Sequence, residues 1–197
     1  MMKKILTLIV LASTAFYAKA QTSSGQMMIG GSLAFSSVNY DNNNGSDYSN
    51  FTLAPSFGYF VKDNFAVGAS VSLGNSKSGT GAGQSTSSSF GVGPFVRLYK
   101  FTSNDQFAFF GNAGLSFGNT KTENGNVITD KSNTISFAIA PGFAYFFNEH
   151  WAAELSIAGL RIQNSKSDNF PGNDRTSVTF DVSSFNPSLG LRYHFGN

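Results

Sequence analysis

The chain repeats a unit in which an alternating strand that contains a proline leads through an aromatic-rich tight turn into a second alternating strand. The unit begins at Leu53 to Phe60 and again at Ile139 to Phe146, with variants at Gly93-Pro94-Phe95 and Asn186-Pro187-Ser188. Four of the five prolines therefore lie at equivalent places, 39, 47 and 46 residues apart, a spacing that suits a β-hairpin rather than a helical repeat. Strands of roughly ten residues with period-two hydrophobicity are typical of a transmembrane β-barrel.

The first twenty residues have the pattern of a cleaved secretory signal. Lys3 and Lys4 precede an apolar run from Ile5 to Leu11, and small residues end the segment at Ala18-Lys19-Ala20. The apolar run is too short to cross a bilayer as a helix, and an A-x-A ending is a cleavage site. We predict cleavage near Ala20, which leaves residues 21–197 as one domain.

Composition argues against several classes of protein. Three of the thirteen Lys and Arg residues lie in the predicted signal, so ten basic side chains remain against eleven acidic ones. This balance argues against a nucleic-acid partner. The absence of cysteine excludes disulfides, thiolate metal sites and a lipid-modified N-terminal cysteine. With two histidines and no suitably spaced carboxylates, we expect no metal and no other cofactor.

Period-two alternation predicts eight strands, and hence an all-β, eight-stranded antiparallel up-and-down transmembrane barrel. One face of each strand is apolar and the other carries small or polar side chains, as where Val67 and Val71 alternate with Ser70 in the third strand. Seven strands are predicted at residues 26–39, 49–61, 65–74, 88–99, 106–118, 133–147 and 151–162. The eighth strand is predicted to end over residues 187–195. The alternation slips near Gly159-Leu160 and Ser183-Ser184, which indicates bulges or early strand ends.

The predicted connections fall into two classes. Three are short, at residues 62–64, 101–105 and 148–150, and four are long and polar, at residues 40–48, 75–87, 119–132 and 163–177. Outer-membrane barrels have short periplasmic turns and long extracellular loops, so we expect both termini to be periplasmic.

Aromatic side chains gather beside the short turns. Rings with one wet edge favour the membrane interface, so we predict a periplasmic aromatic girdle. Its predicted members are Tyr59, Phe65, Tyr99, Phe107, Tyr145 and Trp151.

The inward-facing phase consists mostly of Gly, Ala and Ser, with a few larger members that include Phe95, Phe110, Asn112 and Phe146. An eight-stranded barrel is just wide enough for side chains to fill its interior, and a charge in the membrane zone must be paired. We therefore predict that the lumen is plugged by an interior ion network of four side chains, Arg97, Glu154, Arg192 and His194.

The C-terminal strand reads Ser188-Leu189-Gly190-Leu191-Arg192-Tyr193-His194-Phe195, with Gly196 and Asn197 after the last aromatic. On this segment and the hairpin pattern, the mature chain resembles the small eight-stranded outer-membrane barrels of the OmpX and OmpA transmembrane-domain class. It is especially similar to the outer membrane protein beta-barrel domain family common in Bacteroidetes-type bacteria. The resemblance implies a Gram-negative outer-membrane location and an insertion signal at Gly190, Tyr193 and Phe195. It also implies contact with outer-membrane lipids and lipopolysaccharide, and with the assembly machinery and periplasmic chaperones during biogenesis.

Several functions remain open at this point. The favoured interpretation is a plugged barrel with an envelope-structural or surface-interaction role through its four long loops, whose ligand is unknown. A narrow passive channel for small solutes is the alternative, and a lipid-modifying barrel enzyme is a further one. We expect no enzyme and no catalytic residue, because His150 and His194 both lie near the short turns, away from the outer leaflet.

Two other interpretations rest on weaker patterns. A soluble lipocalin-like barrel would need apolar side chains inside and polar ones outside, which is the inverse of the observed alternation. The segment from Asp41 to Asp47 has a faint likeness to a calcium loop but lacks the later glutamate.

Overall fold

The structure is a computed structural model that describes residues 22–39, 47–79, 83–125, 127–169, 174–180 and 188–196. Within these ranges the chain forms ten strands and is all-β, as predicted. No helix among the described residues is long and apolar enough to cross a membrane. The strands are β1 (Met27–Val38), β2 (Tyr48–Lys62), β3 (Phe65–Ser78), β4 (Ser85–Phe101), β5 (Phe107–Asn124), β6 (Val127–Phe146), β7 (Trp151–Ser156), β8 (Leu160–Ser167), β9 (Arg175–Phe180) and β10 (Ser188–Phe195).

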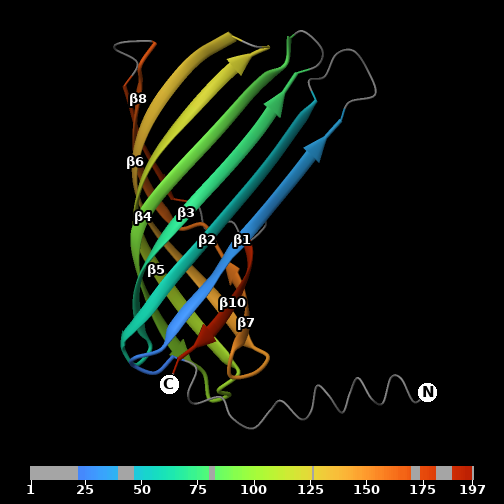
Figure 1. The fold of residues 1–197 in the computed structure, drawn as a ribbon. Coiled ribbons are helices and arrows are strands. Elements are labelled where there is room, and N and C mark those ends of the chain that lie inside the picture. The colour runs from blue at the N-terminus through green and yellow to red at the C-terminus, as the bar shows by residue number, and fades with distance from the viewer. Residues whose placement is uncertain are drawn as a thin grey trace, which may run out of the picture.

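Antiparallel pairing closes the sheet into a barrel (Figure 1). Strands β1 to β6 pair in sequence order, β6 pairs with β7, β7 with β10, and β10 with β1. At the end that carries the short turns, eight strands therefore surround the lumen. Toward the other end, β8 replaces β7 as the partner of β6, and β9 pairs with β8.

The predicted count of eight strands is corrected to ten among the described residues. In place of the strand predicted over 151–162 the chain forms β7 and β8, separated by residues 157–159 at the predicted phase slip. The register changes there by one residue, from Gly142 opposite Ser156 to Ile139 opposite Leu160. Such an extra residue is a bulge that ends one ladder and starts another. The last strand is likewise represented by β9 and β10, and the second slip, at Ser183-Ser184, lies outside the described residues.

The prolines explain where the ladders are interrupted. Pro55, Pro94 and Pro141 all face outward, and proline has no N–H to give to a ladder. The β2–β3 pairing skips Ala54 and Pro55, and the β4–β5 pairing skips Gly93 and Pro94. Pro141 lies opposite the break between β7 and β8, where its carbonyl accepts a hydrogen bond from the Ile157 N–H at 2.9 Å. Each proline therefore interrupts the pairing on one side of its strand; Pro187 lies outside the described residues.

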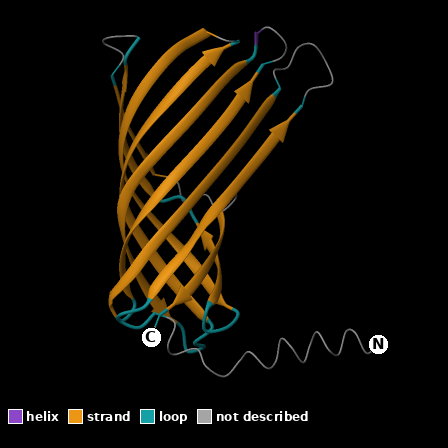
Figure 2. Ribbon diagram, viewed as in Figure 1, coloured by secondary structure: helices purple, strands orange, loops and turns teal. Residues whose placement is uncertain are grey.

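The short turns, the segment before β1 and the end of β10 gather at one end of the barrel (Figure 2). Asp63 and Asn64 form the tightest of these turns, and Asn64 takes a positive φ of 64°, which asparagine tolerates better than most residues. The segment before β1 packs against this turn, since the Asn64 N–H donates to the Thr22 carbonyl at 2.8 Å and the Ser24 N–H donates to Asp63 Oδ1 at 2.8 Å.

At the opposite end the strands are longer than predicted. Residues 75–78, 85–87, 119–124, 127–132, 163–167 and 175–177 were expected in long loops and are strand instead. Backbone hydrogen bonds continue to pair strands beyond the apolar band, so the end of the hydrophobic alternation does not end the ladder. Only residues 125 and 126 lie between β5 and β6, so the loop predicted over 119–132 is a two-residue connection.

The two faces of the barrel differ as the alternation predicts. The outer face exposes large apolar side chains, among them Leu33, Leu98 and Phe109, each more than half accessible. A contiguous apolar surface of this kind belongs against lipid rather than water, which contradicts a soluble lipocalin-like barrel. The predicted signal (residues 1–20) and most of the calcium-like segment, residues 41–46, lie outside the described residues.

Candidate functional site

A layer of packed rings fills the lumen at the short-turn end. Phe60, Phe146 and His194 are almost fully buried, and Tyr99 and Phe110 pack between them. The Tyr99 ring lies 6.0 Å from Phe60, 5.8 Å from Phe110 and 6.3 Å from Phe146, measured between centroids. These separations are those of favourable aromatic pairs. We call Met28, Phe60, Tyr99, Phe110, Phe146 and His194 the aromatic layer.

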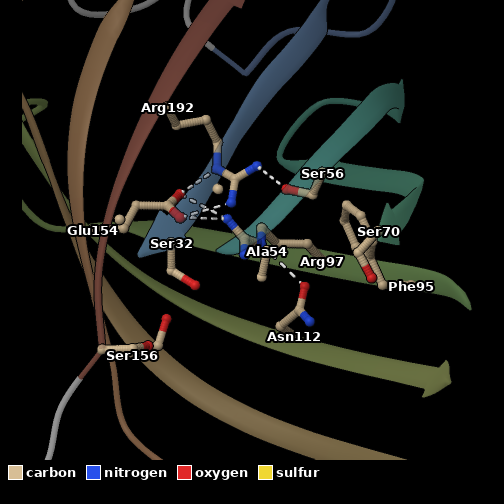
Figure 3. A pocket seen from close by; sticks show the side chains of 13 residues that line it. Ser32, Ala54, Ser56, Ser70, Phe95, Arg97, Asn112, Glu154, Ser156 and Arg192 are labelled. Atoms are coloured by element: carbon tan, nitrogen blue, oxygen red, sulfur yellow. Dashed lines mark hydrogen bonds and ion pairs between the residues drawn. The ribbon is translucent and has the colours of Figure 1, made fainter. Parts of the chain in front are cut away.

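A buried ion network lies directly on this layer. The Glu154 carboxylate accepts from Arg97 Nη1 at 2.7 Å and from Arg192 Nε at 2.8 Å (Figure 3). Arg192 Nη2 donates to the second carboxylate oxygen at 2.9 Å, so this pair is bidentate. Two parallel N–H donors match a carboxylate in geometry as well as in charge. Glu154 is therefore clamped by two guanidinium groups.

Neutral side chains complete the network. The Tyr99 hydroxyl donates to Glu154 Oε1 at 2.9 Å and accepts from Arg97 Nη1 at 3.1 Å. Asn112 Oδ1 accepts from Arg97 Nε at 3.2 Å, and Ser56 Oγ accepts from Arg192 Nη1 at 3.1 Å. The Arg97 guanidinium also lies 4.4 Å above the Phe110 ring, a cation–π distance that ties the network to the aromatic layer.

Three strands position the charges. Arg192 on β10 and Glu154 on β7 lie on neighbouring strands, where Gly190 is opposite Glu154 and Arg192 is opposite Ala152. Arg97 reaches them from β4, a strand that pairs with neither. All three residues occupy the inward phase of their strands, and each is at most 6% exposed. The contact between Arg97 and Glu154 crosses the lumen and therefore needs the closed barrel.

The structure corrects one predicted member of the aromatic girdle. Tyr99 is 3% exposed and points into the lumen, because it shares the inward phase of β4 with Phe95 and Arg97. Tyr59 and Trp151 are exposed on the outer face, and Phe65, Phe107 and Tyr145 are partly exposed there. Phe107 packs on Tyr145 with ring centroids 4.9 Å apart. That these five contact the periplasmic membrane interface stays a prediction.

His194 was predicted in the ion network, and the structure places its ring in the aromatic layer, 5.4 Å from Phe146 and 5.8 Å from Phe60. Its backbone carbonyl accepts from His150 Nδ1 at 2.9 Å, a bond that joins the short turn to β10. Sequence reasoning did not assign Met28 and Phe60 to the interior. The signal that identifies them is phase, since Phe60 alternates with the outward Tyr59 and Val61.

The predicted insertion signal lies in β10. Tyr193 and Phe195 are stacked on the outer face with ring centroids 5.9 Å apart, and Tyr193 also contacts Trp151 at 4.9 Å. Gly190 faces inward, where a Cβ would lie 3.0 Å from the Gly31 carbonyl oxygen of the neighbouring strand. These contacts give the three residues a packing role; recognition by an assembly machinery stays a prediction.

Comparisons with known proteins agree with this architecture. A family model described as outer membrane protein beta-barrel domain matches residues 6–195. The outer membrane protein OprG of Pseudomonas aeruginosa superposes with a TM-score of 0.55 at 18% identity, covering 90% of this chain and 99% of OprG. Neisserial surface protein A gives a TM-score of 0.49 at 16% identity, covering 86% of this chain and 95% of its own. At 18% identity the OprG match shows the fold alone. A search of curated proteins finds no match.

Proposed function

Because the chain belongs to the outer membrane protein beta-barrel domain family, we propose that it is an integral outer-membrane barrel whose lumen is closed to solutes. The observation that carries this proposal is the stacking of the aromatic layer on the ion network, which together occupy the lumen at the short-turn end. A barrel ringed by eight strands leaves only enough room for side chains. The protein then serves the envelope as a structural element or through interactions at its surface.

Conductance measurements test the closed lumen. We expect the refolded wild-type barrel to be silent in planar bilayers, with heat-modifiable gel mobility confirming that it is folded. Replacing Phe60 and Phe146 with alanine removes two nearly fully buried rings from the aromatic layer and is expected to produce discrete openings.

The matched control replaces two outward-facing rings, Phe109 and Phe117, with alanine, and it is expected to stay silent because no lumen atom is removed. Steady openings of the wild type would contradict the proposal and favour a narrow passive channel for small solutes. The conductance of the wild type distinguishes a closed lumen from a channel even if the variant with alanine at both Phe60 and Phe146 does not fold.

We also propose that the short-turn end is periplasmic, that the signal over residues 1–20 is removed, and that the opposite end faces the cell exterior. Cysteine labelling tests this orientation, because the natural chain contains no cysteine. Ser78 and Ser103 are both exposed and lie at opposite ends of the barrel. We expect Ser78→Cys to react with a bulky membrane-impermeant maleimide in intact cells, and Ser103→Cys to react only after the outer membrane is permeabilised.

The reverse pattern of labelling would overturn both the orientation and any surface role of the end opposite the short turns, which we call the long-connection end.

At the long-connection end we propose contact with lipopolysaccharide or other envelope components. This proposal is supported by strands that continue as polar hairpins beyond the apolar outer surface of the barrel. We propose no enzymatic activity, since both histidines lie at the short-turn end, where the His194 ring packs against Phe60 and the His150 ring bonds to a backbone carbonyl.

A further inference from the structure

A polar cavity of about 140 Å³ lies in the lumen against the ion network (Figure 3). Its wall includes Arg97, Glu154 and Arg192, and the rest is mainly small or hydroxyl side chains, among them Ser32, Ser56, Ser70, Ser156 and Ser188. An empty cavity of this size in a protein is normally lined by apolar groups. A polar one of the same volume is therefore filled by water or by a ligand.

The charge on the cavity wall is positive. Two guanidinium groups face one carboxylate, so one positive charge is left over in the network. In low-dielectric surroundings an uncompensated charge is costly, and a counter-charge nearby relieves that cost. The cavity is the space in which a counter-ion fits.

Hydrogen-bond donors that are not used by the network also belong to this wall. Arg97 is 6% exposed, and its Nε and Nη1 bond to Asn112, Tyr99 and Glu154. Its Nη2 has no hydrogen-bond partner among the described residues. A guanidinium carries five N–H donors and no acceptor, so the two on Nη2 remain available to an acceptor in the cavity whose wall Arg97 forms.

A second cavity adjoins this one on the side away from the short turns. It measures about 230 Å³ and shares Ala54, Ser70, Phe95 and Asn112 with the first. Ser72, Ser116 and Ser136 line it further from the short turns, and Arg161 adds another cation. Arg161 has no ion-pair partner among the described residues. Along both cavities the lining carries three arginines and one glutamate.

We propose that the first cavity binds a small oxyanion, of the class of inorganic phosphate, between Arg97, Arg192 and the surrounding serine hydroxyls. A cavity of about 150 Å³ accommodates a molecule as large as benzene, so an oxyanion of four or five heavy atoms fits. Guanidinium and hydroxyl donors are the groups that proteins use for such anions. A cation is disfavoured by the excess positive charge, and an apolar ligand by the polar wall. The site goes beyond the closed lumen proposed above, because it assigns a ligand to the space beside the plug.

Phosphate-dependent unfolding tests the site. A ligand that binds only the folded barrel lowers the unfolding equilibrium constant, about elevenfold at ten times its dissociation constant. We would titrate the refolded wild-type barrel with inorganic phosphate at constant ionic strength, balanced with the bulky anion gluconate, and follow urea unfolding by the fluorescence of Trp151. Phosphate also stabilises proteins in general by exclusion from their surface, so the readout is the difference between variants.

Asn112→Asp is the test variant, because an aspartate keeps the acceptor for Arg97 Nε and adds a negative charge to the wall of both cavities. The control is Asn119→Asp, the same change on the outer, exposed face of the same strand. We expect wild type and Asn119→Asp to gain stability equally with phosphate, and Asn112→Asp to lose most of that gain. An equal gain in all three proteins would overturn the proposal.

A second measurement does not depend on the variant folding. Crystals of the wild-type barrel soaked in bromide are expected to show an anomalous peak within contact distance of Arg97 Nη2 or the Arg192 guanidinium. Peaks confined to the outer surface or to the rim, with none in the cavity, would overturn the site.

Discussion

Replacing Glu154 with glutamine is expected to lower the free energy of unfolding by about 3–5 kcal/mol, the cost of removing one partner from a buried ion pair. Glutamine keeps the shape of the side chain but leaves Arg97 and Arg192 without their shared carboxylate. Two buried guanidinium groups then face each other without the carboxylate that bonds to both of them. The measurement is reversible urea unfolding of the refolded barrel in lipid vesicles, followed by the fluorescence of Trp151, the only tryptophan of the chain.

The matched control is Glu123→Gln, which breaks the ion pair with Lys121 on the outer face of β5. That pair is solvent-accessible, and exposed ion pairs contribute only about 0–1 kcal/mol. A Glu154→Gln barrel as stable as the Glu123→Gln barrel would show that the plug is held by ring packing alone. The ion network would then have no part in keeping the lumen closed.

The second large effect is expected at Gly93 on β4. A Cβ built on this residue would run into the backbone carbonyl of Leu115 on β5, beside the break in pairing that Pro94 causes. Backbone cannot move aside as a flexible side chain does, so Gly93→Ala must push two neighbouring strands apart. We expect a loss of about 3 kcal/mol, at the upper end of the usual cost of overpacking. The same urea unfolding experiment measures it.

Gly111→Ala on β5 is the control for this change. A Cβ at Gly111 meets nothing within 4 Å, so the substitution is expected to alter stability by no more than about 0.5 kcal/mol. Both variants restrict the unfolded chain equally, since each replaces glycine by alanine. Their difference therefore isolates the close approach of β4 and β5. If Gly93→Ala proved as stable as Gly111→Ala, the approach of the two strands would have to be looser than the structure has it.

The phase of each strand was predictable from sequence, because one face of a barrel strand meets lipid and the other meets the lumen. Alternation alone predicts that Arg97, Glu154 and Arg192 point inward, and all three are buried. It also marked the interruption near Gly159, where the register changes by one residue. Strand ends were not predictable in the same way. Hydrogen-bonded pairing continues through polar segments such as residues 119–124 and 127–132, where alternation no longer reports burial.

Tyr99 shows how two sequence signals can conflict. Its place beside a short turn suggested the membrane interface, whereas its phase relative to Val96 and Leu98 put it inside. Phase prevailed because a pleated strand points successive side chains to opposite faces whatever their chemistry. The hydroxyl of Tyr99 is satisfied by Glu154 rather than by interfacial water.

The class of fold, the inward and outward faces and the outer-membrane family were predictable from period-two alternation and from local segments such as β10. Which inward groups meet depends on how the barrel closes. Arg97 on β4 contacts Glu154 on β7 because barrel closure brings together residues 57 positions apart in the chain. The cavity beside them and the unused donors of Arg97 depend on the same closure. Alternation specifies the face of a side chain, whereas its partner across the lumen is set by the register and curvature of every strand between them.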